Sequence, residues 1–208
     1  MREMAEVAAV VAAGVDAIGL IFVEQSPRYI DPERAREIVA SLPPFVDAVG
    51  VFVDQEVAAV NEIVRYCGLT KVQLHGTESP TYCTEISCRV MKAFQVRPSL
   101  TTEDLVPYAG VVSGFLFDTF HEKIAGGTGQ IFDWRLLEKL SPPRPVVLAG
   151  GLTPDNVGEA IRQAHPFAVD FNSGVEVKPG RKDLDKVRAA IAQVAAADAA
   201  WLRLSADS

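Results

Sequence analysis

Short runs of almost continuous hydrophobic residues alternate along this chain with stretches in which hydrophobic residues recur every three or four positions. Continuous runs are typical of parallel strands covered on both faces, and the recurring pattern is typical of helices that lie on a sheet. The runs that we interpret as strands are 16–23, 46–53, 72–75, 90–96, 114–118, 145–148 and 167–171.

Helices are predicted between these runs, most clearly at 3–13, 32–41, 56–67 and 183–201. Asp31 is a favourable cap for the second of them, with a proline at the first helical position. Strict alternation of strands and helices predicts an α/β fold with a parallel sheet. No linker or shift in composition divides the chain, so we expect a single domain over residues 1–208.

Two glycine-rich segments follow the last two predicted strands. Unhindered backbone N–H groups at such turns bind phosphate, and the last two strands carry the phosphate site in a (β/α)₈ barrel. We expect Thr153 to cap a helix that begins at Pro154. For either segment alone, glycines that only end a strand are an equal alternative. The residues that we expect to bind phosphate are Gly150, Gly151, Ser173 and Gly174.

The alternatives for the fold are a closed barrel and an open, doubly wound sheet. A dinucleotide-binding open sheet would have a Gly-x-Gly-x-x-Gly turn after an early strand, and the runs that end at Val23 and Val53 have none. A barrel should open with a strand, however, and this chain opens with the helix at 3–13 and contains seven candidate strands. We therefore predict a TIM (β/α)₈ barrel that lacks its first β-strand.

Composition narrows the class of protein further. The chain is 49% hydrophobic with a net charge of −7, which excludes a basic nucleic-acid-binding surface. It has no hydrophobic run long enough to span a membrane and no signal peptide, so we expect a cytoplasmic protein. The three cysteines and three histidines do not cluster at metal-ligand spacing, and we expect no metal.

Polar residues that end apolar strands are the candidates for chemistry, because barrel active sites lie at those ends. Asp118 could act as a general acid if burial raises its pKa, and Arg28 could hold a carboxylate. His75 would face the barrel mouth, and Gly127 lies in a glycine-rich segment suited to a mobile lid. For each residue a structural role is the alternative. Asp118 could cap a helix or bond within a loop, and Arg28 could be a solvated loop residue. His75 could be a structural histidine, and the segment of Gly127 a plain loop.

In combination, these segments resemble the phosphoribosylanthranilate isomerases of tryptophan biosynthesis over nearly the whole chain. Seven motifs in the right order carry the resemblance: Ser26-Pro27-Arg28-Tyr29-Ile30, Val51-Phe52-Val53, Val72-Gln73-Leu74-His75-Gly76, Phe117-Asp118-Thr119, Gly126-Gly127-Thr128-Gly129 with Phe132-Asp133-Trp134, Ala149-Gly150-Gly151-Leu152, and Asn172-Ser173-Gly174-Val175-Glu176.

The resemblance implies an enzyme that performs an Amadori rearrangement of an aminoaldose to an aminoketose, without a cofactor. It implies that Asp118 is the general acid that protonates the furanose ring oxygen and that Arg28 contacts the anthranilate end of the substrate. His75 and Gly127 would also bind substrate, and the glycine turns would bind the phosphate. The expected partner is a small phosphosugar, bound by a monomer or a homodimer.

One departure from the family concerns the general base, which is a cysteine in a Lys-Ile-Cys-Gly motif at the end of the first strand. This chain has no such motif, and Cys67, Cys83 and Cys88 lie elsewhere. The same segment would supply both the missing strand and the missing base. We expect Met1 to be an internal methionine, because the other site residues are intact; a degenerate relative is the alternative. In either case we expect the chain as given to be impaired.

Two further interpretations stay open. The chain could be a non-catalytic relative that binds a phosphosugar or a partner. It could also be another phosphate-binding barrel enzyme, such as indole-glycerol-phosphate synthase or a histidine-pathway isomerase. Those enzymes would need a lysine–glutamate or paired-aspartate constellation at other strand ends, and Lys92 alone is weak evidence for one.

Overall fold

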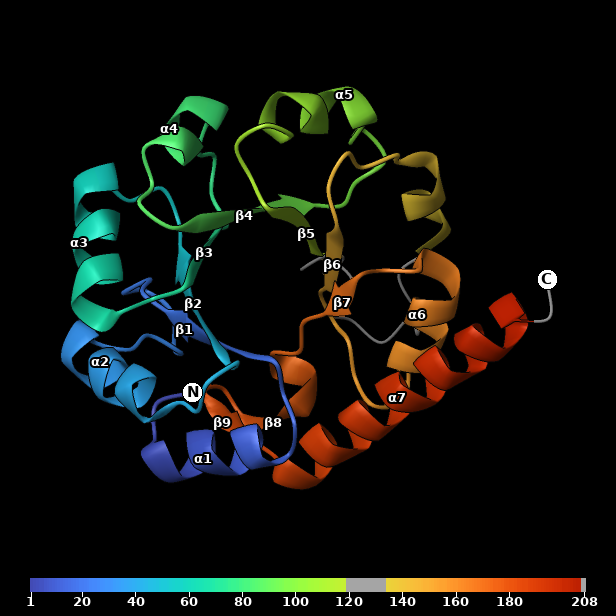
Figure 1. The fold of residues 1–208 in the computed structure, drawn as a ribbon, viewed down its shortest axis with the longest axis horizontal. Coiled ribbons are helices and arrows are strands. Elements are labelled where there is room, and N and C mark those ends of the chain that lie inside the picture. The colour runs from blue at the N-terminus through green and yellow to red at the C-terminus, as the bar shows by residue number, and fades with distance from the viewer. Residues whose placement is uncertain (119–133, 207–208) are drawn as a thin grey trace.

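Seven parallel strands form the centre of the molecule in a computed structural model that describes residues 1–118 and 134–206 (Figure 1). They lie side by side in chain order, each hydrogen-bonded to the next. This order, with helices on the outside, is that of a TIM barrel. The strands are β1 (Ala17–Ile21), β2 (Asp47–Phe52), β3 (Lys71–Leu74), β4 (Arg89–Gln95), β5 (Gly114–Asp118), β6 (Val146–Ala149) and β7 (Ala168–Val169).

Helices surround the ring of strands in Figure 1. The long ones are α1 (Met4–Ala12), α2 (Pro32–Ser41), α3 (Val57–Cys67), α6 (Val157–Ala164) and α7 (Leu184–Ala206). The short ones are α4 (Pro80–Thr84), α5 (Thr102–Leu105) and the 3₁₀ turns η1 (Val106–Tyr108), η3 (Trp134–Lys139) and η4 (Ser173–Val175). A small antiparallel hairpin, β8 (Glu176–Lys178) and β9 (Arg181–Lys182), precedes α7.

Capping explains where two of these helices begin. The Asp31 carboxylate accepts the N–H of Arg34 at 2.8 Å, which confirms the predicted start of α2. The prediction that Thr153 caps a helix from Pro154 is wrong, because α6 begins at Val157. The side chain of Asn156 accepts the N–H of Thr153 at 2.8 Å, and this bond holds the intervening residues in a turn.

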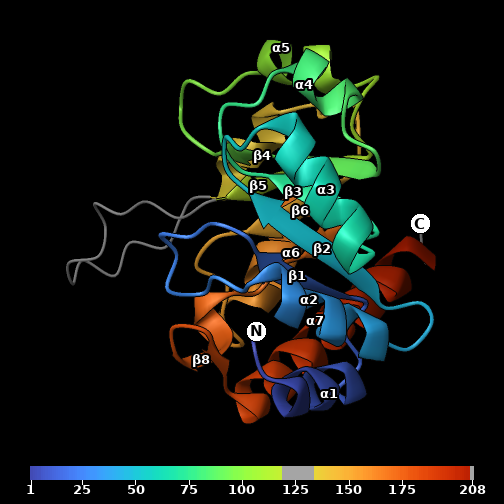
Figure 2. The ribbon, with the colours of Figure 1, turned by 90° about the vertical axis from the view of Figure 1, so that its left-hand side faces the viewer.

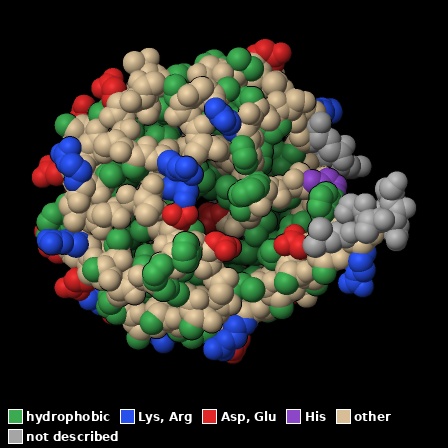
Figure 3. Space-filling model, in the orientation of Figure 1, with side chains coloured by type: hydrophobic (Ala, Val, Ile, Leu, Met, Phe, Trp, Pro, Cys, Tyr) green, Lys and Arg blue, Asp and Glu red, His purple; other side chains and the backbone are tan. Residues whose placement is uncertain are grey.

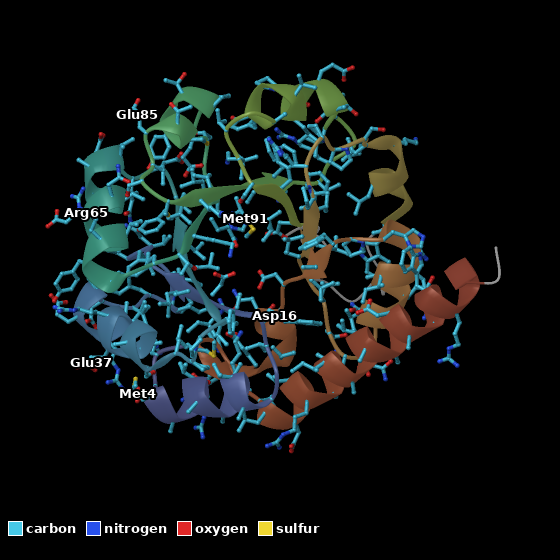
Figure 4. All side chains as sticks on the ribbon, in the orientation of Figure 1. Met4, Asp16, Glu37, Arg65, Glu85 and Met91 are labelled. Carbon is cyan, nitrogen blue, oxygen red and sulfur yellow. The ribbon has the colours of Figure 1, made fainter. Side chains whose placement is uncertain are left out.

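The hydrophobic core has two layers. The larger layer lies between strands and helices and includes the stacked rings of Phe22 and Phe52, whose centroids are 5.1 Å apart. A small inner cluster, Ala93, Leu116 and Ala149 with Met91 against it, fills the inside of the ring. Figure 4 shows Met91 pointing toward the centre of the ring. The small residues make this inner layer thin.

The ring of strands is open between β7 and β1. Among the described residues, β1 pairs along its length only with β2, and β7 pairs only with β6. The alternate residues of β1, Ala17 and Gly19, are exposed, whereas Ile18 and Leu20 are buried. The prediction of a barrel without its first strand is therefore confirmed for this chain.

The helix layer, by contrast, continues across the seam. Val10 of α1 packs with Val187 and Ala190 of α7, and Figures 1 and 2 both show the two helices side by side. The strand layer is therefore interrupted between β7 and β1, whereas α1 and α7 continue the helix layer outside it.

Adding a strand between β7 and β1 should stabilise the protein. We expect a chain extended at its N-terminus by a first strand of the family type to melt about 5–10 °C higher. Burying about 100 Å² more apolar surface contributes about 2.5 kcal/mol. It should also associate less, because unpaired edges are sticky. Thermal melting and light scattering measure both effects, with a Gly/Ser extension of equal length as the control. Equal melting temperature and equal solubility in all three chains would contradict this expectation.

The strands begin on the face shown in Figure 3, where hydrophobic and acidic side chains surround a central hollow. Their carboxyl ends lie on the opposite face, at the left of Figure 2, and this end is the mouth of the barrel.

Within residues 1–118 and 134–206, no helix is both long and apolar enough to cross a membrane.

Candidate active site

Asp118 and His75 meet at the mouth of the barrel. Asp118 is the last residue of β5 and lies in register with Gln95 of β4 and Ala149 of β6. The His75 Nε2 atom is 3.6 Å from Asp118 Oδ2, and both side chains are about 30% exposed. Both line a cavity of about 460 Å³. The structure thus brings together two residues that the sequence placed at separate strand ends.

The tautomer of His75 follows from its other nitrogen. His75 Nδ1 is 3.1 Å from the amide nitrogen of Gln73, as that amide is assigned from the hydrogen-bond network. The Gln73 amide nitrogen can only donate, so Nδ1 of a neutral ring accepts and the proton lies on Nε2, facing Asp118. His75 is therefore arranged to donate toward the Asp118 carboxylate.

A buried ion pair that the sequence analysis missed supports the loop that carries His75. Lys92 Nζ lies 3.1 Å from Glu78 Oε2 and also donates to the carbonyls of Leu74 and Gly76, and both charged side chains are at most 3% exposed. The Glu78 carboxylate in turn accepts the N–H groups of Asp54 and Gly76. A buried lysine needs such a partner. The presence of Lys92 within an apolar strand was the sign in the sequence from which a buried ion pair could have been expected.

The two glycine turns touch each other. Gly150 and Gly151 have φ angles of +88° and +66°, a region that favours glycine. A Cβ atom added to Gly174 would lie 1.8 Å from the backbone oxygen of Leu152. Only glycine allows the chain after β7 to approach the chain after β6 this closely. Ser173, which begins η4, is exposed beside this contact.

Arg28 lies in the loop after β1 and is paired with Glu176 of β8. Its Nη2 is 2.6 Å from Glu176 Oε2, and its Nε is 2.9 Å from Oε1. The hydrogen bond to Glu176 raises the pKa of Arg28. Burial opposes ionisation of Glu176, but the bonds from Arg28 and the charge of Lys182 outweigh it and lower the pKa of that carboxyl. Both groups are therefore charged near neutral pH.

Asp170 is a second carboxylate at the mouth, directly after β7, where its N–H donates to the carbonyl of Leu148 at 2.8 Å. Desolvation raises the pKa of its carboxyl, although the residue is exposed to solvent. The charges of Lys182 and His75 lower it, and that of Asp118 raises it. These four groups therefore share one electrostatic environment.

The cysteines lie away from this mouth. Burial raises the pKa of Cys67 in α3 and of Cys83 in α4 to about 11, so neither is a thiolate near neutral pH. Cys88 precedes β4, at the opposite face. Gly127 and the rest of the glycine-rich segment 125–130 lie outside the described residues. Within the described ranges, no group of three or more potential ligands could hold a metal ion.

A parallel barrel with these groups at the carboxyl ends of its strands has the fold and the site position of a TIM-barrel enzyme. The family model described as N-(5'phosphoribosyl)anthranilate (PRA) isomerase matches residues 1–193. The chain belongs to this family, as its motifs had indicated.

Individual relatives agree with the family match. An N-(5'-phosphoribosyl)anthranilate isomerase of Trichlorobacter lovleyi is 52% identical over 179 residues, 86% of each chain. One from Moorella thermoacetica is 45% identical over 209 residues, covering 100% of this chain and 92% of its own. The crystal structure of phosphoribosyl anthranilate isomerase from Thermotoga maritima is similar with a TM-score of 0.81 and 38% identity, covering 93% of this chain and 94% of its own.

A further solved structure contains a ligand. It is a phosphoribosyl anthranilate isomerase in complex with reduced 1-(o-carboxyphenylamino)-1-deoxyribulose 5-phosphate. It is 37% identical with a TM-score of 0.77, and the match covers 93% of this chain and 94% of that one.

Proposed function

We propose that this chain carries the substrate site of an N-(5'-phosphoribosyl)anthranilate isomerase, acting in tryptophan biosynthesis. The reaction converts the aminoaldose to 1-(2-carboxyphenylamino)-1-deoxyribulose 5-phosphate. The observation that carries the proposal is the register of Asp118 with Ala149, the residue before Gly150. The proposed acid thus lies beside the proposed phosphate turn, as a ligand with a sugar ring next to its phosphate requires.

Asp118 is the general acid in this proposal. It protonates the furanose ring oxygen, the C1′–O bond breaks, and the nitrogen lone pair forms a Schiff base. His75, with its proton on Nε2, stabilises the carboxylate that remains after the proton has left. Removal of the C2′ proton then gives an enolamine, which tautomerises to the ketone, so no external oxidant or cofactor is needed.

The two ends of the substrate bind at separate groups of residues at the mouth. Arg28 contacts the anthranilate carboxylate, because a guanidinium matches the planar geometry of that group. Gly150, Gly151, Ser173 and Gly174 present backbone N–H groups to the phosphate. Gly127 and His75 also contact the substrate. The partner is a small phosphosugar, and we propose that the protein acts as a monomer or a homodimer.

The chain as given lacks the base for the second proton transfer. The family's Lys-Ile-Cys-Gly cysteine is absent from the sequence, and the open seam between β7 and β1 is where its strand would lie. Loss of a general base costs about 10²–10⁴-fold in rate. We therefore propose that the 208-residue chain binds the substrate but turns it over slowly.

A second candidate function is non-catalytic binding of a phosphosugar at the same glycine turns. An activity assay distinguishes the isomerase from the binding protein. The assay uses a chain extended by the missing strand and monitors conversion of freshly made phosphoribosylanthranilate through the loss of its fluorescence. Turnover supports the isomerase. Binding of the reduced product analogue without turnover in the extended chain would establish the binding protein instead.

A further inference from the structure

The Arg28–Glu176 pair leaves one edge of the guanidinium facing away from Glu176. The carboxylate takes the Nε–Nη2 edge, with Nη2 to Oε2 at 2.6 Å and Nε to the two oxygens at 2.9 and 3.2 Å. A guanidinium has a second, coplanar edge formed by Nη1 and Nη2. Glu176 thus fixes the direction in which that second edge points.

Burial and further contacts make Glu176 a rigid support. Its side chain is 4% exposed, whereas that of Arg28 is 19% exposed. The N–H of Gly180 donates to Glu176 Oε1 at 3.2 Å, and Lys182 Nζ lies 3.3 Å from the same oxygen. The carboxylate is therefore held from its own hairpin while Arg28 retains contact with solvent.

Lys182 connects this cluster to the phosphate side. Its Nζ donates to the backbone oxygen and the side-chain oxygen of Asn172 at 2.8 and 3.2 Å, as well as to Glu176. Three acceptors suit a protonated ammonium group. Burial lowers the pKa of this ammonium group, and the charges of Glu176 and Asp170 oppose that shift. Asn172 directly precedes Ser173, so the cluster also sets a spacing to the phosphate turn.

We propose that Glu176 is a positioning residue that presents Arg28 end-on to an aromatic carboxylate of the ligand, and that Lys182 holds Glu176 in place from its other side. The inference rests on the proposed function for the kind of ligand. Glu6 accepts the backbone N–H of Lys182, and the Met1 amino group also lies near the cluster. Burial lowers the pKa of that amino group, and the Asp170 carboxylate also acts on Lys182, so several charges besides the Arg28–Glu176 pair surround Lys182.

The role of Glu176 can be tested through ligand affinity, because positioning and charge alone predict changes in opposite directions. Removing a negative charge near a bound carboxylate should tighten binding. Under our proposal, Glu176→Gln instead weakens binding of reduced 1-(o-carboxyphenylamino)-1-deoxyribulose 5-phosphate by about tenfold. The same ligand without its ring carboxylate should bind to the Glu176→Gln chain within about twofold of its affinity for the unchanged chain. Titration calorimetry with the 208-residue chain measures all four affinities.

Glu176→Asp provides a second test, because it keeps the charge and shortens the side chain by one methylene. Positioning predicts the same selective loss as Glu176→Gln, and a charge effect predicts no change. Arg28→Lys should cost less affinity in a Glu176→Gln background than alone, because both changes act through one contact. Glu159→Gln on α6, an exposed carboxylate paired with Arg162, is the matched control and should leave both ligands unaffected.

The outcomes distinguish the role of Glu176 from the proposed function of the chain. Unchanged or tighter binding of the carboxylated ligand by both Glu176 variants would overturn the role of Glu176 and leave the proposed function intact. If neither ligand binds to the unchanged chain, the proposed function itself is overturned. Equal weakening of both ligands would also overturn the inference, because it would show a general structural role.

Discussion

Replacing Asp118 with asparagine should lower kcat of the strand-extended chain by about 10²–10⁴-fold. Asparagine keeps the shape of the side chain but cannot give up a proton to the ring oxygen. Because Asp118 acts in the chemical step, KM should change little. Steady-state kinetics with freshly made substrate measures both parameters.

The control for this substitution is Asp185→Asn. Its side chain is 94% exposed, at the start of α7 and away from the mouth. It should leave kcat within about twofold. If the Asp118→Asn enzyme retains most of its kcat, the proton comes from another group at the mouth, and the role that we assign to Asp118 is wrong.

Gly174→Ala should abolish tight binding of phosphorylated ligands. The new Cβ would lie 1.8 Å from the backbone oxygen and 2.8 Å from the carbonyl carbon of Leu152, and these backbone atoms cannot move aside as a side chain can. The two glycine turns would have to separate, at a cost of about 1–3 kcal/mol in stability. We expect affinity for the reduced product analogue to fall by at least about tenfold, as measured by calorimetry.

Gly110→Ala is the matched control for this prediction. A Cβ atom there would meet nothing within 4 Å, and the residue lies outside the candidate site. It should leave both melting temperature and affinity unchanged. Unaltered binding by a folded Gly174→Ala protein would show that the contact between the turns does not shape the phosphate site.

The sequence predicted the strands well because their signal is local. All seven runs form strands at nearly the expected positions, since a strand buried on both faces must be apolar at almost every residue. The last strand is shorter than expected, Ala168–Val169 against 167–171, although Phe167 and Asp170 still hydrogen-bond to β6. The predicted start of α6, with Thr153 as the cap and Pro154 as the first helical residue, was wrong because residues 154–156 form a turn and the helix begins at Val157.

The electrostatic contacts of the site could not be predicted in the same way. Arg28 and Glu176 are 148 residues apart, and Lys92 and Glu78 are 14 apart. Such pairs depend on how the strands are arranged in space, which periodicity along the chain does not encode. The sequence identified Arg28 as a carboxylate-binding group, but only the fold shows that a buried carboxylate already holds one edge of it.

The most direct test of the account compares isomerase activity in three chains. These are the 208-residue chain, the same chain extended by a first strand that ends in Lys-Ile-Cys-Gly, and that extended chain with alanine in place of the cysteine. We predict activity in the cysteine version that exceeds the other two by about 10²–10⁴-fold. Equal activity in all three would contradict the account, because the base would then be a residue already present in this chain.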